Sequence, residues 1–175
     1  MLVGKKDVVA FRIEPPDSSE VMLRNVSIFM DGIEFTKRDS LVYVPSYLFS
    51  LRNEIPRLYE SHRIENYCEE LADGSATEVH AWLTDESPSA VKDKAIRELL
   101  CLNLGETTLN LLSFFIALRS GTWLTCQSFN PDSDNLIHAV RIDADDLAEI
   151  FATAADTLER DYSAPRRPAG HSRHD

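Results

Sequence analysis

The sequence predicts an α+β fold in which helices pack on one face of an antiparallel sheet. Three features support this prediction. Asp31-Gly32 lies between two apolar runs, which is the strongest short-range signal for a β-hairpin. Residues 109–142 are the most apolar part of the chain, and two turn sequences divide them into three segments that suit a meander. Apolar residues then recur at helical spacing from Leu147 to Leu158, which indicates a C-terminal amphipathic helix.

The N-terminal part is expected to contribute strands, because apolar and polar residues alternate along it. Val26, Ile28 and Met30 share one face of the strand that leads into the Asp31-Gly32 turn. Pro45 closes the last of these strands, since proline cannot donate to a ladder. The expected strands cover residues 9–13, 21–30, 33–36 and 41–44.

A helix is expected to follow, with Ser46 as its N-cap. Pro56 lies inside the apolar pattern of this helix, so we expect a kink or two short helices. Helical structure is expected to continue over residues 57–72, until the turn sequence Asp73-Gly74-Ser75 ends it.

Residues 77–84 are expected to form another strand, because Val79 and Leu83 belong to an apolar alternation. A second helix is expected after it, with Ser87 as N-cap and Pro88 at the first helical position.

The Leu109–Leu118 run is apolar on both faces, so it fits either a buried strand or a buried helix. A strand is favoured, because residues 123–129 and 138–142 alternate and complete a three-stranded meander with it. If Asn130 pairs with Leu136, Ser128 lies opposite His138. In that register one face of the hairpin carries Leu124, Cys126, Val140 and Ile142.

The C-terminal helix is expected to begin after Asp143, which suits an N-cap. Asp145 and Asp146 then lie near the positive end of its dipole. Residues 1–162 are expected to form a single α+β domain. Residues 163–175 contain proline, arginine and histidine and almost nothing to bury, so a disordered tail is expected.

The composition restricts the classes of function. The formal net charge of −11 argues against nucleic acid or an anionic membrane as a direct ligand, since phosphate binding needs clustered basic residues. The N-terminus lacks the apolar region of a secretory signal. Cys68, Cys101 and Cys126 are odd in number and widely spaced, which favours reduced thiols in a cytoplasmic protein.

No stretch carries a catalytic or cofactor motif, and neither a metal site nor a cofactor is expected. One enzymatic alternative stays open. Ser128 or Cys126 could act as a nucleophile with His138 as its base, in a small hydrolase. This alternative requires the nucleophile and the base to lie within hydrogen-bonding distance in an open cleft.

Acidic residues concentrate in two segments. Residues 60–86 carry eight carboxylates against Arg63, and residues 132–161 carry nine against Arg141 and Arg160. These segments are either solvated helix faces or a surface that docks on a basic protein. The candidate partner-binding residues are Glu65, Tyr67, Glu69, Glu70, Trp82, Asp145, Asp146 and Glu149.

The layout resembles the immunity proteins of bacterial polymorphic-toxin systems. Three segments carry the resemblance: residues 26–33 around the Asp31-Gly32 turn, the Tyr43-Val44-Pro45 entry to a helix, and residues 140–143 leading to Leu147 and Phe151. The resemblance implies a cytosolic inhibitor that covers the active site of a toxin.

The sequence thus predicts a non-catalytic cytosolic binding protein, of the immunity type, that neutralises a basic toxin or effector domain through an acidic surface. The small hydrolase is one alternative. The other is a structural or assembly subunit, with the apolar central stretch partly at a subunit interface. The oligomeric state and the identity of the partner stay open.

Overall fold

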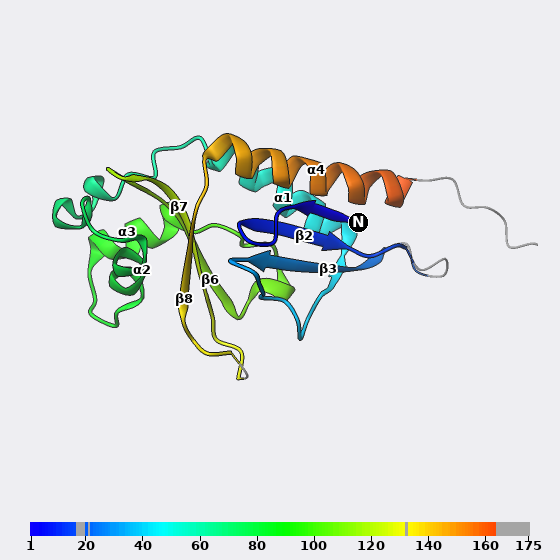
Figure 1. Cartoon of the computed structure of the whole chain (residues 1–175), viewed down its shortest axis with the longest axis horizontal. Helices are drawn as coiled ribbons and strands as arrows, with labels where there is room; N and C mark the ends of the chain where they lie inside the picture. The colour runs from blue at the N-terminus through cyan, green and yellow to red at the C-terminus, as the bar shows by residue number, and fades with distance from the viewer. Residues whose placement is uncertain (17–19, 21, 132, 164–175) are drawn as a thin grey trace, which may run out of the picture.

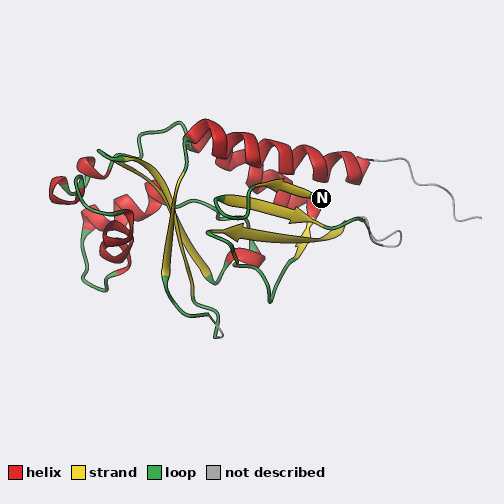
Figure 2. Cartoon of the chain, viewed as in Figure 1, coloured by secondary structure: helices red, strands yellow, loops and turns green. Residues whose placement is uncertain are grey.

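The computed structural model describes residues 1–16, 20, 22–131 and 133–163. Within these residues the strands form two antiparallel sheets, which confirms the α+β fold class. Figure 1 shows the strands β6, β7 and β8 standing across the middle of the molecule, with α2 and α3 on one side and the N-terminal sheet, α1 and α4 on the other. Figure 2 shows the same division by element type.

The N-terminal sheet contains the hairpin expected at Asp31-Gly32. Asp31 has a φ of 53° and Gly32 a φ of 78°, which is the backbone that a tight hairpin turn needs. The strand order is β1-β2-β3-β4, and β5 pairs with β3 beside β4. The strands are β1 (Leu2–Gly4), β2 (Val9–Ile13), β3 (Leu23–Met30), β4 (Ile33–Glu34) and β5 (Leu41–Tyr43).

The central sheet is the expected meander, in the order β6-β7-β8. Its strands are β6 (Leu111–Leu118), β7 (Gly121–Ser128) and β8 (Ile137–Arg141). The ambiguous apolar run is therefore a strand. Both of its faces are apolar because Phe115 packs into one hydrophobic core while Phe114 and Ile116 pack into another.

The register assumed for the β7–β8 hairpin is wrong by two residues. Cys126 lies opposite His138, so Ser128 does not pair with it. The hydroxyl of Ser133 donates to the carbonyl oxygens of Ser128 and Asn130, both at 2.7 Å, and this closes the loop before β8 begins. A shift of two residues keeps every side chain on its expected face. Leu124, Cys126, Val140 and Ile142 are accordingly all buried.

The first core lies between the N-terminal sheet, the central sheet and two long helices, α1 (Val44–Arg57) and α4 (Ala144–Ser163). Phe151 of α4 meets Phe11 of β2 edge to face, with ring centroids 5.8 Å apart. Arg52 of α1 forms an ion pair with Glu159 of α4 at 2.5 Å. The predicted C-terminal amphipathic helix is thus confirmed, and it packs on α1 along its length (Figure 1).

The second core lies on the far side of the central sheet, beneath α2 (Ala76–Thr84) and α3 (Ala90–Leu99). Ala76, Val79, His80 and Leu83 of α2 are buried, at the spacing of one helix face. The strand expected over residues 77–84 is therefore wrong. Ser75 and Glu78 form a capping box, which starts a helix at this point.

The helix expected over residues 57–72 is also wrong. After α1 the chain forms only the short 3-10 helices η1 (Ile64–Asn66) and η2 (Glu69–Leu71). The carbonyl of His62 accepts a hydrogen bond from the amide of Ala117 at 2.9 Å. The segment thus bonds to the edge of β6, and its own backbone hydrogen bonds form only short turns.

Three details of helix starts and interruptions differ from expectation. The first helix begins at Val44, because Pro45 suits its first turn, and Ser46 lies inside it. Pro56 does not divide that helix, which ends one residue later. The third helix is capped by Ser89, not Ser87, and so begins beyond Pro88. The backbone carbonyl and the hydroxyl of Ser87 instead accept hydrogen bonds from Lys92 Nζ, at 3.0 and 2.9 Å.

The remaining short element, η3 (Glu106–Thr108), leads into β6. Residues 164–175 of the expected tail lie outside the described residues, and α4 ends at Ser163. The single domain over residues 1–162 stays a prediction, which the sharing of β6 between the two cores supports.

Candidate protein-binding surface

The β6–β7 turn places Arg119 among three carboxylates of the first acidic segment. Its guanidinium donates to the carboxylates of Glu69 and Asp73, and its Nε lies 3.8 Å from Glu65 Oε2. Arg63 holds the other oxygen of Glu65 at 2.8 Å. The acidic side chains of η1, η2 and the following turn are therefore gathered at one end of the central sheet.

The second acidic segment reaches the same end of the sheet through the start of α4. The hydroxyl of Thr122, at the beginning of β7, donates to Asp143 Oδ1 at 3.2 Å. Tyr59, in the turn after α1, contacts Asp145, and hydrogen bonding to that carboxylate raises the pKa of the tyrosine hydroxyl. The start of α4 and the first acidic segment thus lie at the same end of the central sheet, although they are far apart in the sequence.

We call this set of carboxylates the acidic rim. Its members, Glu65, Glu69, Asp73, Asp143 and Asp145, surround the end of the central sheet at which β6 turns into β7 and β8 leads into α4. Arg63 and Arg119 compensate part of its charge, and the guanidinium of Arg141 lies over Gly121 at the same end of the sheet, so five carboxylates stand against three arginines. Asp145 also occupies the first turn of α4, so its charge lies at the positive end of the helix dipole.

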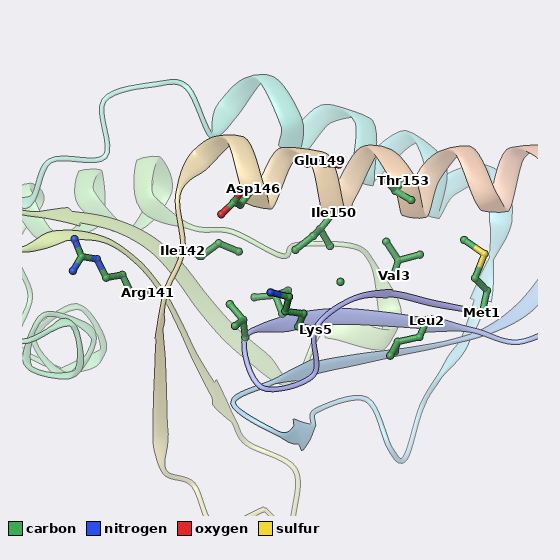
Figure 3. A pocket seen from close by; sticks show the side chains of 13 residues that line it. Met1, Leu2, Val3, Lys5, Arg141, Ile142, Asp146, Glu149, Ile150 and Thr153 are labelled. Carbon is green, nitrogen blue, oxygen red and sulfur yellow. The ribbon is translucent and has the colours of Figure 1, made fainter.

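Two further predicted residues, Asp146 and Glu149, lie on α4 next to the rim but line a different feature. They form part of a groove of about 550 Å³ between α4 and the N-terminal strand β1. Figure 3 shows the side chain of Asp146 under the first turns of α4, on the side that faces β1.

The structure places two of the remaining candidates, Tyr67 and Trp82, near α3. Tyr67 donates a hydrogen bond to Glu98, and burial together with this carboxylate raises its pKa to about 12. Trp82 packs against the second core, and Lys92 Nζ lies 5.8 Å from its ring centroid. Glu70 is exposed and accepts a hydrogen bond from Cys68 Sγ at 3.3 Å. These three side chains are thus not part of the acidic rim.

Sequence reasoning missed the part played by Arg119, and it noted Tyr59 as an aromatic residue beside the first acidic segment without placing it among the candidates. Arg119 belongs to a turn sequence, Arg119-Ser120-Gly121, and nothing in that sequence identifies its acidic neighbours. Tyr59 is an exposed aromatic residue beside an acidic segment, and that is the only signal that could have singled it out.

The side chains of the hydrolase alternative are close in space but do not form the required pair. Ser128 and His138 line one cleft of about 500 Å³. The Ser128 hydroxyl accepts from the side-chain amide of Asn130 at 3.1 Å, whereas His138 Nδ1 lies 3.2 Å from Asp31 Oδ2. Cys126 is buried, and burial raises the pKa of its thiol. Among the described residues of this cleft, no nucleophile is hydrogen-bonded to the imidazole.

Residues 1–16, 20, 22–131 and 133–163 contain neither a metal-binding cluster nor a membrane-spanning helix. No group of three or more His, Cys, Asp or Glu side chains is arranged to hold a metal ion. In the same part of the chain, no helix has the length and apolar character needed to cross a membrane.

No family model and no curated protein sequence matches the chain. One solved structure is similar in fold: CdiI from Burkholderia dolosa AUO158, a contact-dependent inhibition immunity protein. The similarity covers 90% of this chain and 99% of that chain, with a TM-score of 0.60 and 13% sequence identity. At this identity the similarity concerns the fold alone. At that level it supports the predicted resemblance to toxin immunity proteins.

Proposed function

We propose that the protein is a non-catalytic, cytosolic inhibitor of the immunity type, which binds and neutralises a toxin or effector domain. The observation that carries the proposal is the fold similarity to an immunity protein over nearly the whole of both chains. A shared fold does not by itself define a function. The net charge of this chain and its acidic rim therefore provide the further support for a protein-binding function.

The acidic rim supports a basic partner. Its five carboxylates come from the segment before α2 and from the start of α4, and they outnumber the arginines at this end of the sheet, Arg63, Arg119 and Arg141. Such a surface attracts a positively charged protein and repels nucleic acid and anionic membranes. With a net charge of −11, the whole chain adds to this field.

An exposed aromatic side chain beside the rim, Tyr59, supplies contact area for a partner. Tyr59 is 59% exposed and lies against Asp145. Aromatic side chains next to charged groups are typical of the central contacts of protein interfaces. We propose that Tyr59 acts as such an anchor, while the rim carboxylates direct the approach of the partner.

The alternative of an assembly subunit stays open. Phe114, Phe115 and Ile116 of β6 are buried within the molecule, but Leu109, Phe129 and Leu136 of the apolar central stretch are exposed.

Co-expression tests the proposal. The products of the genes adjacent to this one are expressed alone and together with the protein, and growth and co-purification are measured. We expect one of them to be toxic alone, to be harmless in the presence of the protein, and to purify with it. If none is toxic and none binds, the immunity function is wrong.

A further inference from the structure

A small cavity lies where the edge strand β5, the start of α1 and the segment that leads into β6 meet. Its volume is about 370 Å³, which is within the range of small-ligand sites. β5 contributes Leu41 and Tyr43 to its lining, α1 contributes Tyr47, and the segment before β6 contributes Leu104 and Thr107. This segment enters β6 at the end opposite to the β6–β7 turn, so the cavity is separate from the acidic rim.

Two hydroxyl groups in the cavity wall lack a hydrogen-bond partner among the described residues. Tyr47 is 2% exposed and Thr107 is 8% exposed, and neither Tyr47 Oη nor Thr107 Oγ1 forms a hydrogen bond. Burial raises the pKa of Tyr47, so its hydroxyl is neutral. A buried hydroxyl without a partner destabilises a fold, and nearly all such groups in folded proteins are paired. Two unpaired hydroxyls in one wall therefore indicate a bound group that supplies their partner.

The charge of the lining indicates which kind of group this is. Among the described residues that line the cavity, Glu106 is the charged one, and none is a lysine, arginine or histidine. Arg24 lies opposite Val42 in the neighbouring strand, but it does not line the cavity, and its guanidinium donates to Asp161 at 3.5 Å. An anionic ligand would thus meet a carboxylate and no cation in the lining, whereas a cationic ligand is attracted.

The remaining lining suits an aliphatic chain. Leu104 is buried, whereas Leu41 and Tyr43 are about half exposed. A long basic side chain can lay its aliphatic stem along such apolar surface while its charged end reaches polar groups. The cavity therefore combines an apolar path with a polar, acidic set of acceptors.

We propose that this cavity binds a primary ammonium group on an aliphatic chain, with Tyr47 Oη, Thr107 Oγ1 and the carboxylate of Glu106 as its acceptors. An ammonium group has three donors, one for each of these acceptors. The group comes either from a lysine side chain of a protein or from a free aliphatic amine. The site does not depend on the immunity function.

A blocked lysine, Nα-acetyl-lysine methylamide, tests the cavity in the full chain. The matched control is the norleucine compound, which has the aliphatic chain without the ammonium group. We expect the lysine compound to shift the NMR amide signals of Gly105 and Thr107 in a saturable way, and the norleucine compound to bind about ten-fold more weakly. If neither compound shifts these signals, or if both bind equally well, the proposal is wrong.

A free amine identifies the source of the ammonium group. The probe is n-butylamine, which has the same ammonium group and chain without a peptide backbone. Tighter binding of the blocked lysine would assign the site to a protein side chain. Equal or tighter binding of n-butylamine would assign it to a free amine, and either result supports the cavity as an ammonium site.

Conservative substitutions separate binding from folding. Tyr47→Phe and Thr107→Val each remove a hydroxyl at nearly constant volume. Because neither hydroxyl has a partner in the free protein, we expect the melting temperature to stay the same or rise, while the affinity for the blocked lysine falls about ten-fold. Tyr162→Phe, which removes a hydroxyl outside the cavity, should change neither. A lower melting temperature with unchanged affinity would assign the two hydroxyls to the fold and overturn the proposal.

The carboxylate is tested in the same way. Glu106→Gln should weaken binding of the blocked lysine about ten-fold and remove its advantage over the norleucine compound. Glu86→Gln, an equal charge change at an exposed position outside the cavity, should leave the affinity unchanged. Equal affinities in the two folded variants would contradict the role of Glu106. None of these measurements requires a captured toxin, so the ammonium site and the immunity function can fail separately.

Discussion

His80 Nδ1 lies 2.8 Å from Thr125 Oγ1, and both side chains are fully buried in the second core. The bond connects α2 to the middle strand of the central sheet. His80 also meets Phe114 edge to face, with ring centroids 5.0 Å apart. A neutral imidazole is therefore built into the contact that holds α2 on β7.

This contact predicts an acid sensitivity. Burial lowers the pKa of His80 from its usual value of 6.5 to about 4. Below pH 6.5 the unfolded chain binds a proton that the folded chain does not, so stability falls as the pH falls from about 6.5 toward 4. Between pH 7 and pH 5 the unfolding free energy of the wild type should fall. In His80→Gln this fall should be smaller by about 2 kcal/mol. Urea unfolding at the two pH values measures it, and an equal loss in both proteins would contradict the burial of a neutral His80.

A partly buried ion pair on α1 also bonds to the end of α3. Glu54 is buried, and burial raises the pKa of its carboxyl despite the opposing effect of Arg57. Arg57 donates to Glu54 at 3.1 Å and to the carbonyl of Leu100 at 3.0 Å. Arg57→Ala leaves the carboxylate buried without its cation, so we expect a loss of about 3 kcal/mol.

The control for this prediction is the Arg52–Glu159 pair, whose side chains are both about half exposed. Exposed ion pairs contribute little to stability, so Arg52→Ala should change the unfolding free energy much less than Arg57→Ala. Chemical denaturation of both variants gives the comparison. Similar losses of unfolding free energy in the two variants would contradict a larger contribution from the Arg57–Glu54 pair.

The start of α2 gives a local test of the revised secondary structure. Ser75 Oγ accepts a hydrogen bond from the amide of Glu78 at 3.2 Å. The amide of Ser75 donates in turn to the carboxylate of Glu78 at 2.7 Å. Ser75→Ala should cost about 1 kcal/mol, because it leaves a helix amide without its cap. Ser75→Asp, which can still cap, should retain most of the stability. If thermal unfolding shows no loss in Ser75→Ala, the capping box is not formed in solution.

The sequence contained the signal for this helix, but the interpretation overlooked it. Ser75 and Glu78 have the spacing of a capping box, and the buried positions follow a helical period of which Val79 and Leu83 are members. In a segment this short, the same residues also satisfy an alternating pattern. The Asp31-Gly32 hairpin was predictable because its turn chemistry is local and unambiguous.

The arrangement of the acidic rim could not be predicted from the sequence. The contacts of Arg119 with Glu69 and Asp73, and of Tyr59 with Asp145, join positions far apart in the chain. They depend on how the segment after α1 bonds to the edge of β6, where a helix was expected. Local patterns carry no information about such a placement, although they did identify several of the acidic residues that meet there.

The measurement that tests the central claim most directly is the salt dependence of association with the captured toxin domain. The Debye length is about 8 Å at 0.15 M salt and about 3 Å at 1 M, so the reach of the rim carboxylates shortens with salt. We expect the association rate to fall about ten-fold over this range, with a smaller change in the dissociation rate. The double variant Glu69→Lys with Asp145→Lys should show a slow association rate at low salt and little further dependence. An association rate that is the same at low and high salt, in the wild type and the variant, would contradict an acidic surface that recruits a basic partner.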